Sequence, residues 1–126
     1  MTQQETLEST ETDRYKSLNV LRDIVHGVAK EKGWHSFEET EMAYVSRFVA
    51  NVHGETSELW ESARKGTLKQ NCDKLCAITA EDEELADILI RVLDYCGRRN
   101  IDIAGAVEAK SRFNATRPYR HGGKAA

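Results

Sequence analysis

The near absence of proline constrains the fold of this chain more than any other feature. The sequence has 126 residues and one proline, Pro118, which lies close to the C-terminus. Proline removes a backbone donor and breaks helices, so most of the chain can form long helices without interruption. Charged residues make up 31% of the sequence and aromatic residues only 7%. Because a chain rich in Ala, Glu, Leu and Arg also has high helix propensity, we expect an all-α fold.

Apolar residues recur at helical spacing in four stretches. The predicted helices cover about residues 15–32, 39–64, 80–98 and 103 to 114 or 116. Gly33 and Gly66 follow the first two, as glycine commonly does after a helix, and Asp102 is a predicted N-cap of the fourth. Four helices with short connections predict a four-helix bundle.

The ends of the chain and its overall charge suggest one soluble domain. Residues 1–14 are polar, and we expect a disordered or loosely packed tail before a single helical domain over residues 15–126, with a basic C-terminal tail from about residue 117. The net charge of −3 argues against a nucleic-acid partner. No apolar run approaches the roughly 20 residues of a membrane span. Three unpaired cysteines and no secretory signal predict a cytoplasmic protein with reduced thiols.

The second predicted helix carries a carboxylate on its apolar face. Val45, Val52 and Leu59 share one apolar stripe with Phe48, and Glu55 falls inside it. Glu58 lies on the edge of the stripe. A buried carboxylate without a partner is costly, so a positive group should face Glu55.

The third predicted helix presents a second acidic pair. Glu84 and Asp87 lie on one border of its apolar face, and Arg91 and Asp94 continue that border. Carboxylates that meet between two helices would repel each other unless they bind a divalent cation, and all-oxygen ligands favour Mg²⁺, with Mn²⁺ as a substitute. A di-iron carboxylate site would need E-x-x-H motifs, and the sequence has none. Solvated acids on separate surfaces remain the alternative, since such pairs are common on charged helices.

The order of these motifs resembles that of the MazG-like all-α nucleotide pyrophosphohydrolases. E-x-x-E at Glu55 and Glu58 is followed, after 25 residues, by E-x-x-D at Glu84 and Asp87. The segments HGETSELWE, EELADILIRVLDYCG and KSRFNATRPYRHGGK are also similar to the family. The resemblance extends over nearly the whole chain apart from the N-terminal tail.

The resemblance implies Mg²⁺-dependent hydrolysis of (deoxy)nucleoside triphosphates to a monophosphate and pyrophosphate by a homodimer or homotetramer, a dimer of dimers. It also implies roles for individual residues. Glu55, Glu58, Glu84 and Asp87 match the metal-binding acids, and Glu55 or Glu58 would activate the attacking water. Lys110, Asn114 and Arg117 match positions near the phosphates or the sugar.

Other side chains have two interpretations each. Lys110 either binds phosphate or extends a snorkelling side chain to water. Arg91 either contacts substrate or neutralises Asp87 or Asp94, and we favour neutralisation. Trp34 could stack on a base as a substrate-binding residue, but large aromatics more often pack in cores, which we favour for Trp34 and Phe37.

Two alternatives to triphosphate hydrolysis stay open. One is a pyrophosphohydrolase of the same architecture that acts on a nucleotide-like metabolite. The other is a non-catalytic helical interaction module whose acids are only solvated. The base preference and the number of metal ions do not follow from the sequence.

Overall fold

The chain folds into four α-helices joined by loops, as expected for an all-α protein. A computed structural model describes residues 2–120 and residue 125, without the side chains of residues 8 and 9. The helices are α1 (Gln3–Glu31), α2 (Glu41–Lys65), α3 (Ala80–Arg98) and α4 (Ile103–Thr116). Within the described residues, the β-type pairing is a single isolated bridge between Asn71 and Thr79. None of the described helices is long and apolar enough to cross a membrane.

The ends of α2, α3 and α4 follow from local capping chemistry. Thr40, Thr79 and Asp102 each accept a hydrogen bond from a backbone N–H of the first turn of α2, α3 and α4. Gly66 ends α2 in the left-handed region at φ 70°, where a side chain would be strained. These bounds confirm the helix limits predicted from periodicity to within about two residues.

Helix α1 begins at Gln3, and the prediction that it starts near Tyr15 was wrong. Thr2 and Glu5 form a capping box, in which each side chain bonds the backbone N–H of the other residue. Polar composition hid this start, since Thr, Glu and Gln lack the apolar periodicity that marks a helix. Most described side chains of this first part of α1 are exposed, and its status as a tail outside the domain stays a prediction. The predicted basic C-terminal tail lies largely outside the described residues.

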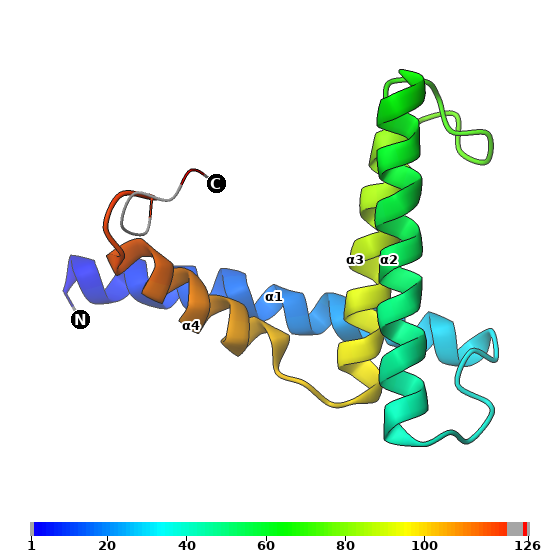
Figure 1. Cartoon of the computed structure of the whole chain (residues 1–126). Helices are drawn as coiled ribbons and strands as arrows, with labels where there is room; N and C mark the ends of the chain where they lie inside the picture. The colour runs from blue at the N-terminus through cyan, green and yellow to red at the C-terminus, as the bar shows by residue number, and fades with distance from the viewer. Residues whose placement is uncertain (1, 121–124, 126) are drawn as a thin grey trace.

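The helices form two arms (Figure 1). α2 and α3 run antiparallel side by side, α4 packs along α1, and α3 crosses α1 where the arms meet. Buried side chains from three helices, Tyr44, Leu93, Cys96 and Ala104, mark the core. The rings of Phe48 and Tyr95 stack there at 4.0 Å between centroids. Within its described residues a single chain therefore forms two helix pairs and not one closed bundle.

Many large apolar side chains stay exposed in this arrangement. On α1, Val20, Ile24 and Val28 repeat every four residues on one face, and each is more than half exposed. On α3, Leu85 and Leu89 are also about half exposed. Contiguous apolar surface of this kind is unusual for a monomer and typical of an interaction surface.

One close approach between α1 and α3 depends on the absence of a side chain. A Cβ on Gly97 would collide with the Cβ and Cγ atoms of His26. The crossing of α1 over α3 therefore needs glycine at this position.

We predict that Gly97→Ala destabilises the fold by about 1–3 kcal/mol, because the α1–α3 crossing must open to admit the methyl group. Gly54→Ala is the matched control, since Gly54 is also helical but has no atom within 4 Å of an added Cβ. The free energy of unfolding of the control should rise by up to about 1 kcal/mol, because alanine has a higher helix propensity than glycine. Urea denaturation of both variants measures the difference, and equal stabilities would contradict the proposed clash.

Candidate functional site

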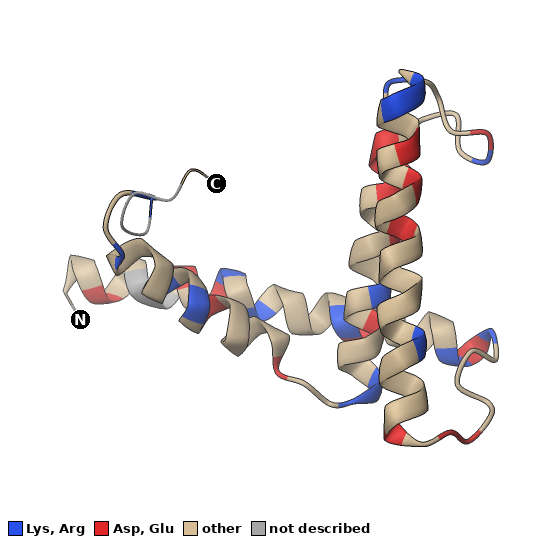
Figure 2. Cartoon of the chain, in the orientation of Figure 1, with Lys and Arg blue, Asp and Glu red and all other residues tan. Residues whose placement is uncertain are grey.

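Pairing of α2 with α3 brings the two acidic motifs together. Carboxylate oxygens of Glu55, Glu58 and Glu84 lie within 4.8 Å of one another. Figure 2 shows the acidic residues as a band across the upper parts of both helices. Each motif places its acids one turn apart, so side chains from both helices can converge between them. Asp87, one turn after Glu84 on α3, is not among these converging oxygens. We call Glu55, Glu58 and Glu84, together with Asp87, the acidic cluster.

Burial distinguishes this cluster from a solvated acidic surface. Glu55 is only 9% exposed. The Oε2 atoms of Glu55 and Glu84 are buried, and neither has a hydrogen-bond partner. A buried carboxylate oxygen without a partner is costly, and a cation between the helices would remove that cost. The donors are all carboxylate oxygens, so they suit a hard divalent cation such as Mg²⁺ or Mn²⁺.

The acids shift one another's protonation. Burial raises the pKa of Glu84 to about 7, and hydrogen bonding to Glu58 and Glu55 together with their negative charge adds to the effect. The pKa of Asp87 is also raised, first by burial and then by the negative charges of Glu55 and Glu83. Arg91 and Lys74 act in the opposite direction on Asp87. Without a cation the cluster therefore retains protons that ordinary carboxyl groups would lose.

The positive partner of Glu55 is Arg91. Its Nε and Nη2 atoms both lie 2.9 Å from Oε1 of Glu55. A positive group does face Glu55 as predicted, but the expectation that Arg91 pairs with Asp87 or Asp94 is corrected by this contact. Asp94 is paired with histidines, and Arg91 affects Asp87 only through its charge. The guanidinium satisfies one oxygen of Glu55 and leaves Oε2 free.

The predicted phosphate-binding residues do not join the acidic cluster within one chain. Lys110, Asn114 and Arg117 belong to α4 or its C-cap, on the arm formed with α1 (Figure 1). The Lys110 side chain is exposed, and its Nζ lies 4.9 Å from the centroid of the Phe113 ring. The acids are on the other arm, so these residues could reach an acidic cluster only in another chain.

The aromatic residues of the loop before α2 are not in the core. Trp34 is 65% exposed and Phe37 is 50% exposed, so the expectation of core packing was wrong for both. Large aromatics usually pack in cores, but the loop runs over the surface where the two arms meet. Trp34 thus remains available to a ligand or a second chain.

A second polar cluster lies lower on α3. Asp94 accepts from Nδ1 of His26 at 2.9 Å and from Nε2 of His35 at 2.8 Å. Arg98 donates to Nδ1 of His35 at 3.2 Å, so the hydrogen of His35 is on Nε2. Both imidazoles are therefore oriented by hydrogen bonds to one carboxylate. The sequence did not reveal this cluster because its members come from α1, the following loop and α3.

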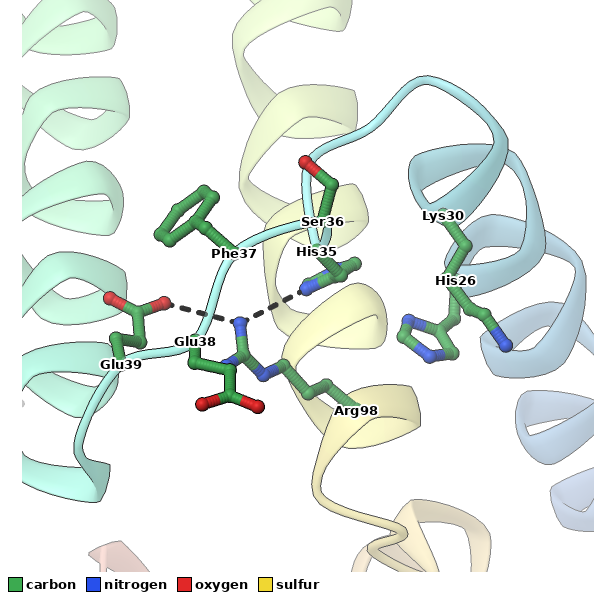
Figure 3. Close-up of a pocket in the computed structure, with 8 residues that line it drawn as sticks. All are labelled: His26, Lys30, His35, Ser36, Phe37, Glu38, Glu39 and Arg98. Carbon is green, nitrogen blue, oxygen red and sulfur yellow. Dashed lines mark hydrogen bonds and ion pairs between the residues drawn. The ribbon is translucent and has the colours of Figure 1, made fainter.

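An open pocket lies beside these histidines (Figure 3). Its volume is about 540 Å³, and its walls come from α1, the loop and the end of α3. It is lined by His26, Lys30, His35, Ser36, Phe37, Glu38, Glu39 and Arg98. Arg98 bridges His35 and Glu39, which fixes one wall. Such a mixture of one aromatic ring and several donors and acceptors suits a small polar ligand.

Comparisons with family models, curated proteins and solved structures found no match to this chain.

We predict that Glu84→Gln reduces the pH dependence of stability in EDTA. The pKa of Glu84 is about 7 in the folded chain against an ordinary value of 4.5, so the folded state holds this proton while the unfolded state releases it. The bound proton of Glu84 makes its full contribution to the free energy of unfolding below about pH 4.5, and this contribution is lost as the pH rises through about 7. Urea denaturation at about pH 5 and about pH 8 measures the free energy of unfolding, which should decrease less between these pH values for the variant than for the wild type.

Glu61→Gln is the control for this experiment. Glu61 is on the same arm, but it pairs with Arg64 and Lys65 at the surface. Its substitution should keep the wild-type pH dependence. Parallel curves for wild type and Glu84→Gln would show that Glu84 is not buried against other carboxylates.

Proposed function

We propose that the chain is a Mg²⁺-dependent, MazG-like pyrophosphohydrolase that cleaves (deoxy)nucleoside triphosphates to a monophosphate and pyrophosphate. One observation carries the proposal: two buried carboxylate oxygens, on Glu55 and Glu84, lack any partner in a cluster made only of oxygen donors. The order of the acidic motifs supports the family assignment. A non-catalytic helical module would gain nothing from two buried carboxylate oxygens without a partner at a helix interface.

The acids have unequal tasks in the proposed reaction. Bound Mg²⁺ or Mn²⁺ would supply positive charge to offset the phosphates and the acids. Glu55, Glu58 and Glu84, whose oxygens converge, would hold the cation together with Asp87. Glu58 is the exposed member of the converging three, so it can also orient a water molecule and accept its proton. The water oxygen forms a bond to phosphorus as the bridge between the α and β phosphates breaks, and pyrophosphate leaves.

The pocket beside the histidines offers space for the rest of the nucleotide. Asp87, Arg91, Asp94 and Arg98 follow one another along one side of α3 at steps of three or four residues. Arg98, which lines the pocket, is about 16 Å from Asp87 along the helix axis, so a nucleotide that reaches both would have to lie extended along α3. A small cavity of about 40 Å³ is lined by Asn51, Arg91 and Asp94 among others. Phe37 lines the pocket and Trp34 is exposed in the same loop, so both rings are candidates for stacking on a base.

A second copy of the chain would complete this site. The exposed apolar face of α1 needs a partner, and the basic residues of α4 lie far from their own acidic cluster. A homodimer, or a dimer of dimers, covers the apolar face and can bring Lys110, Asn114 and Arg117 to an acidic cluster of another chain. Three free cysteines agree with the proposed cytoplasmic location.

We predict that Ile24→Glu dissociates the oligomer. Ile24 is 58% exposed at the centre of the apolar face of α1, and two-fold symmetry would bury the new charge in both copies. Light scattering coupled to gel filtration should give a multiple of the chain mass for the wild type and the monomer mass for the variant. Lys65→Glu, at an exposed position at the end of α2 on the other arm, should leave the mass unchanged. A monomeric wild type would contradict the proposed assembly.

We predict that Glu58→Gln lowers Mg²⁺-dependent turnover by about 100-fold or more, because it removes the group that accepts the proton of water. A panel of ribo- and deoxynucleoside triphosphates, with pyrophosphate and orthophosphate measured separately, tests both the reaction and the variant. Glu58 is exposed, so the variant should fold normally. Glu61→Gln should stay within about twofold of the wild type, as expected for a surface carboxylate.

The products discriminate between the alternatives. Orthophosphate as the sole product would contradict cleavage between the α and β phosphates. Turnover only with nucleotide-like metabolites would favour the second enzymatic alternative. No turnover, together with no thermal stabilisation by Mg²⁺, would favour the interaction module, since a ligand that binds the native state must stabilise it.

A further inference from the structure

The loop between α2 and α3 is anchored to the start of α3. The backbone N–H of Cys72 donates to Ile78 at 2.9 Å, that of Ala80 to Gln70 at 2.8 Å and that of Glu81 to Leu68 at 3.0 Å. The thiol of Cys72 is buried and lies 2.6 Å from Oε2 of Glu83. These contacts hold the loop beside the acidic stretch of α3 (Figure 2).

The loop carries two lysines in different electrostatic surroundings. Nζ of Lys74 lies 3.8 Å from Oε1 of Glu83, the residue before Glu84. Its charge also acts weakly on the pKa of Asp87, in the lowering direction. Nζ of Lys69 pairs with Glu81 at 2.5 Å and acts on Asp82. The side chains are similarly exposed, 85% for Lys74 and 81% for Lys69.

The other cations of this arm are more fully engaged. Nε and Nη2 of Arg91 both contact Glu55. Arg64 and Lys65 pair with Glu61. The pair between Lys74 and Glu83 is long and exposed, and such pairs contribute little free energy. Lys74 can therefore exchange Glu83 for a more highly charged phosphate group at little cost.

We propose that Lys74 binds the phosphates of the substrate that leave as pyrophosphate. Its ammonium group would reach the β and γ phosphates from the loop side while the acidic cluster holds the cation. The inference rests on the proposed function and adds a phosphate-binding residue from the same chain as the acids. Lys110 and its neighbours on α4 would then be contacts from another copy.

Lys74→Gln, Lys74→Arg and the matched control Lys69→Gln test the assignment. We expect Lys74→Gln to raise KM for the triphosphate and the inhibition constant of inorganic pyrophosphate by about tenfold, as for loss of a charge-assisted hydrogen bond. Inhibition by the nucleoside monophosphate should stay unchanged, because it lacks those phosphates. Lys74→Arg should restore most binding, and Lys69→Gln should resemble the wild type.

Calorimetry separates this inference from the proposed function. Mg²⁺ with inorganic pyrophosphate is titrated into each variant, so the measurement needs no turnover. Equal affinities for wild type and Lys74→Gln, in an enzyme that hydrolyses triphosphates, would overturn the role of Lys74 alone. A wild type that neither hydrolyses triphosphates nor binds Mg²⁺-pyrophosphate would overturn both. All variants should unfold at the wild-type temperature, since both lysines are exposed.

Discussion

The burial of Glu55 between α2 and α3 is the constraint on which the candidate site depends. A carboxylate can lie 9% exposed only if the opposite helix compensates its charge, and Arg91 does so with two donors on one oxygen. This contact sets the register of the two helices and thereby brings Glu58 and Glu84 to the same point. It matters equally that Arg91 contacts only one of the two oxygens of Glu55. If Arg91 satisfied both oxygens, the pair would be a structural ion pair, but Oε2 of Glu55 and Oε2 of Glu84 remain available to a cation.

Charged residues follow one side of α3 from the acidic cluster toward the pocket. Along this side the helix alternates acids and bases roughly once per turn, and Arg91, Asp94 and Arg98 each contact another element. Arg91 contacts Glu55 of α2, Asp94 contacts His26 of α1, and Arg98 contacts Glu39 of the loop before α2. The central helix is therefore held to both neighbours by polar contacts along this side as well as by its apolar face. Polar groups fixed in this way are preorganised, which lowers the cost of binding a polar ligand along the same side.

Sequence reasoning succeeded where the structure is determined locally. The limits of α3 depend on Thr79 and those of α2 on Gly66, and both can be read from capping and helix-ending preferences. The burial of Glu55 followed from one helical wheel. Reasoning failed where a contact joins distant segments. The partner of Arg91 depends on the register of two helices, and the histidine cluster needs three segments to meet at Asp94. The start of α1 was missed for another reason, because its capping box lies in a polar stretch without apolar periodicity.

Two features of the single chain point to packing against a second copy. The first is energetic, since Val20, Ile24 and Val28 expose a regular apolar face along α1. The second is chemical, since the basic residues of α4 share an arm with α1 and not with the acids that would bind a charged substrate. A chain that folded to act alone would be expected to turn the apolar face inward and to close its helices into one bundle. The arm of α1 and α4 carries both an apolar face and basic side chains, so it is suited to pack against another copy. Burial of the apolar face would then position the basic side chains.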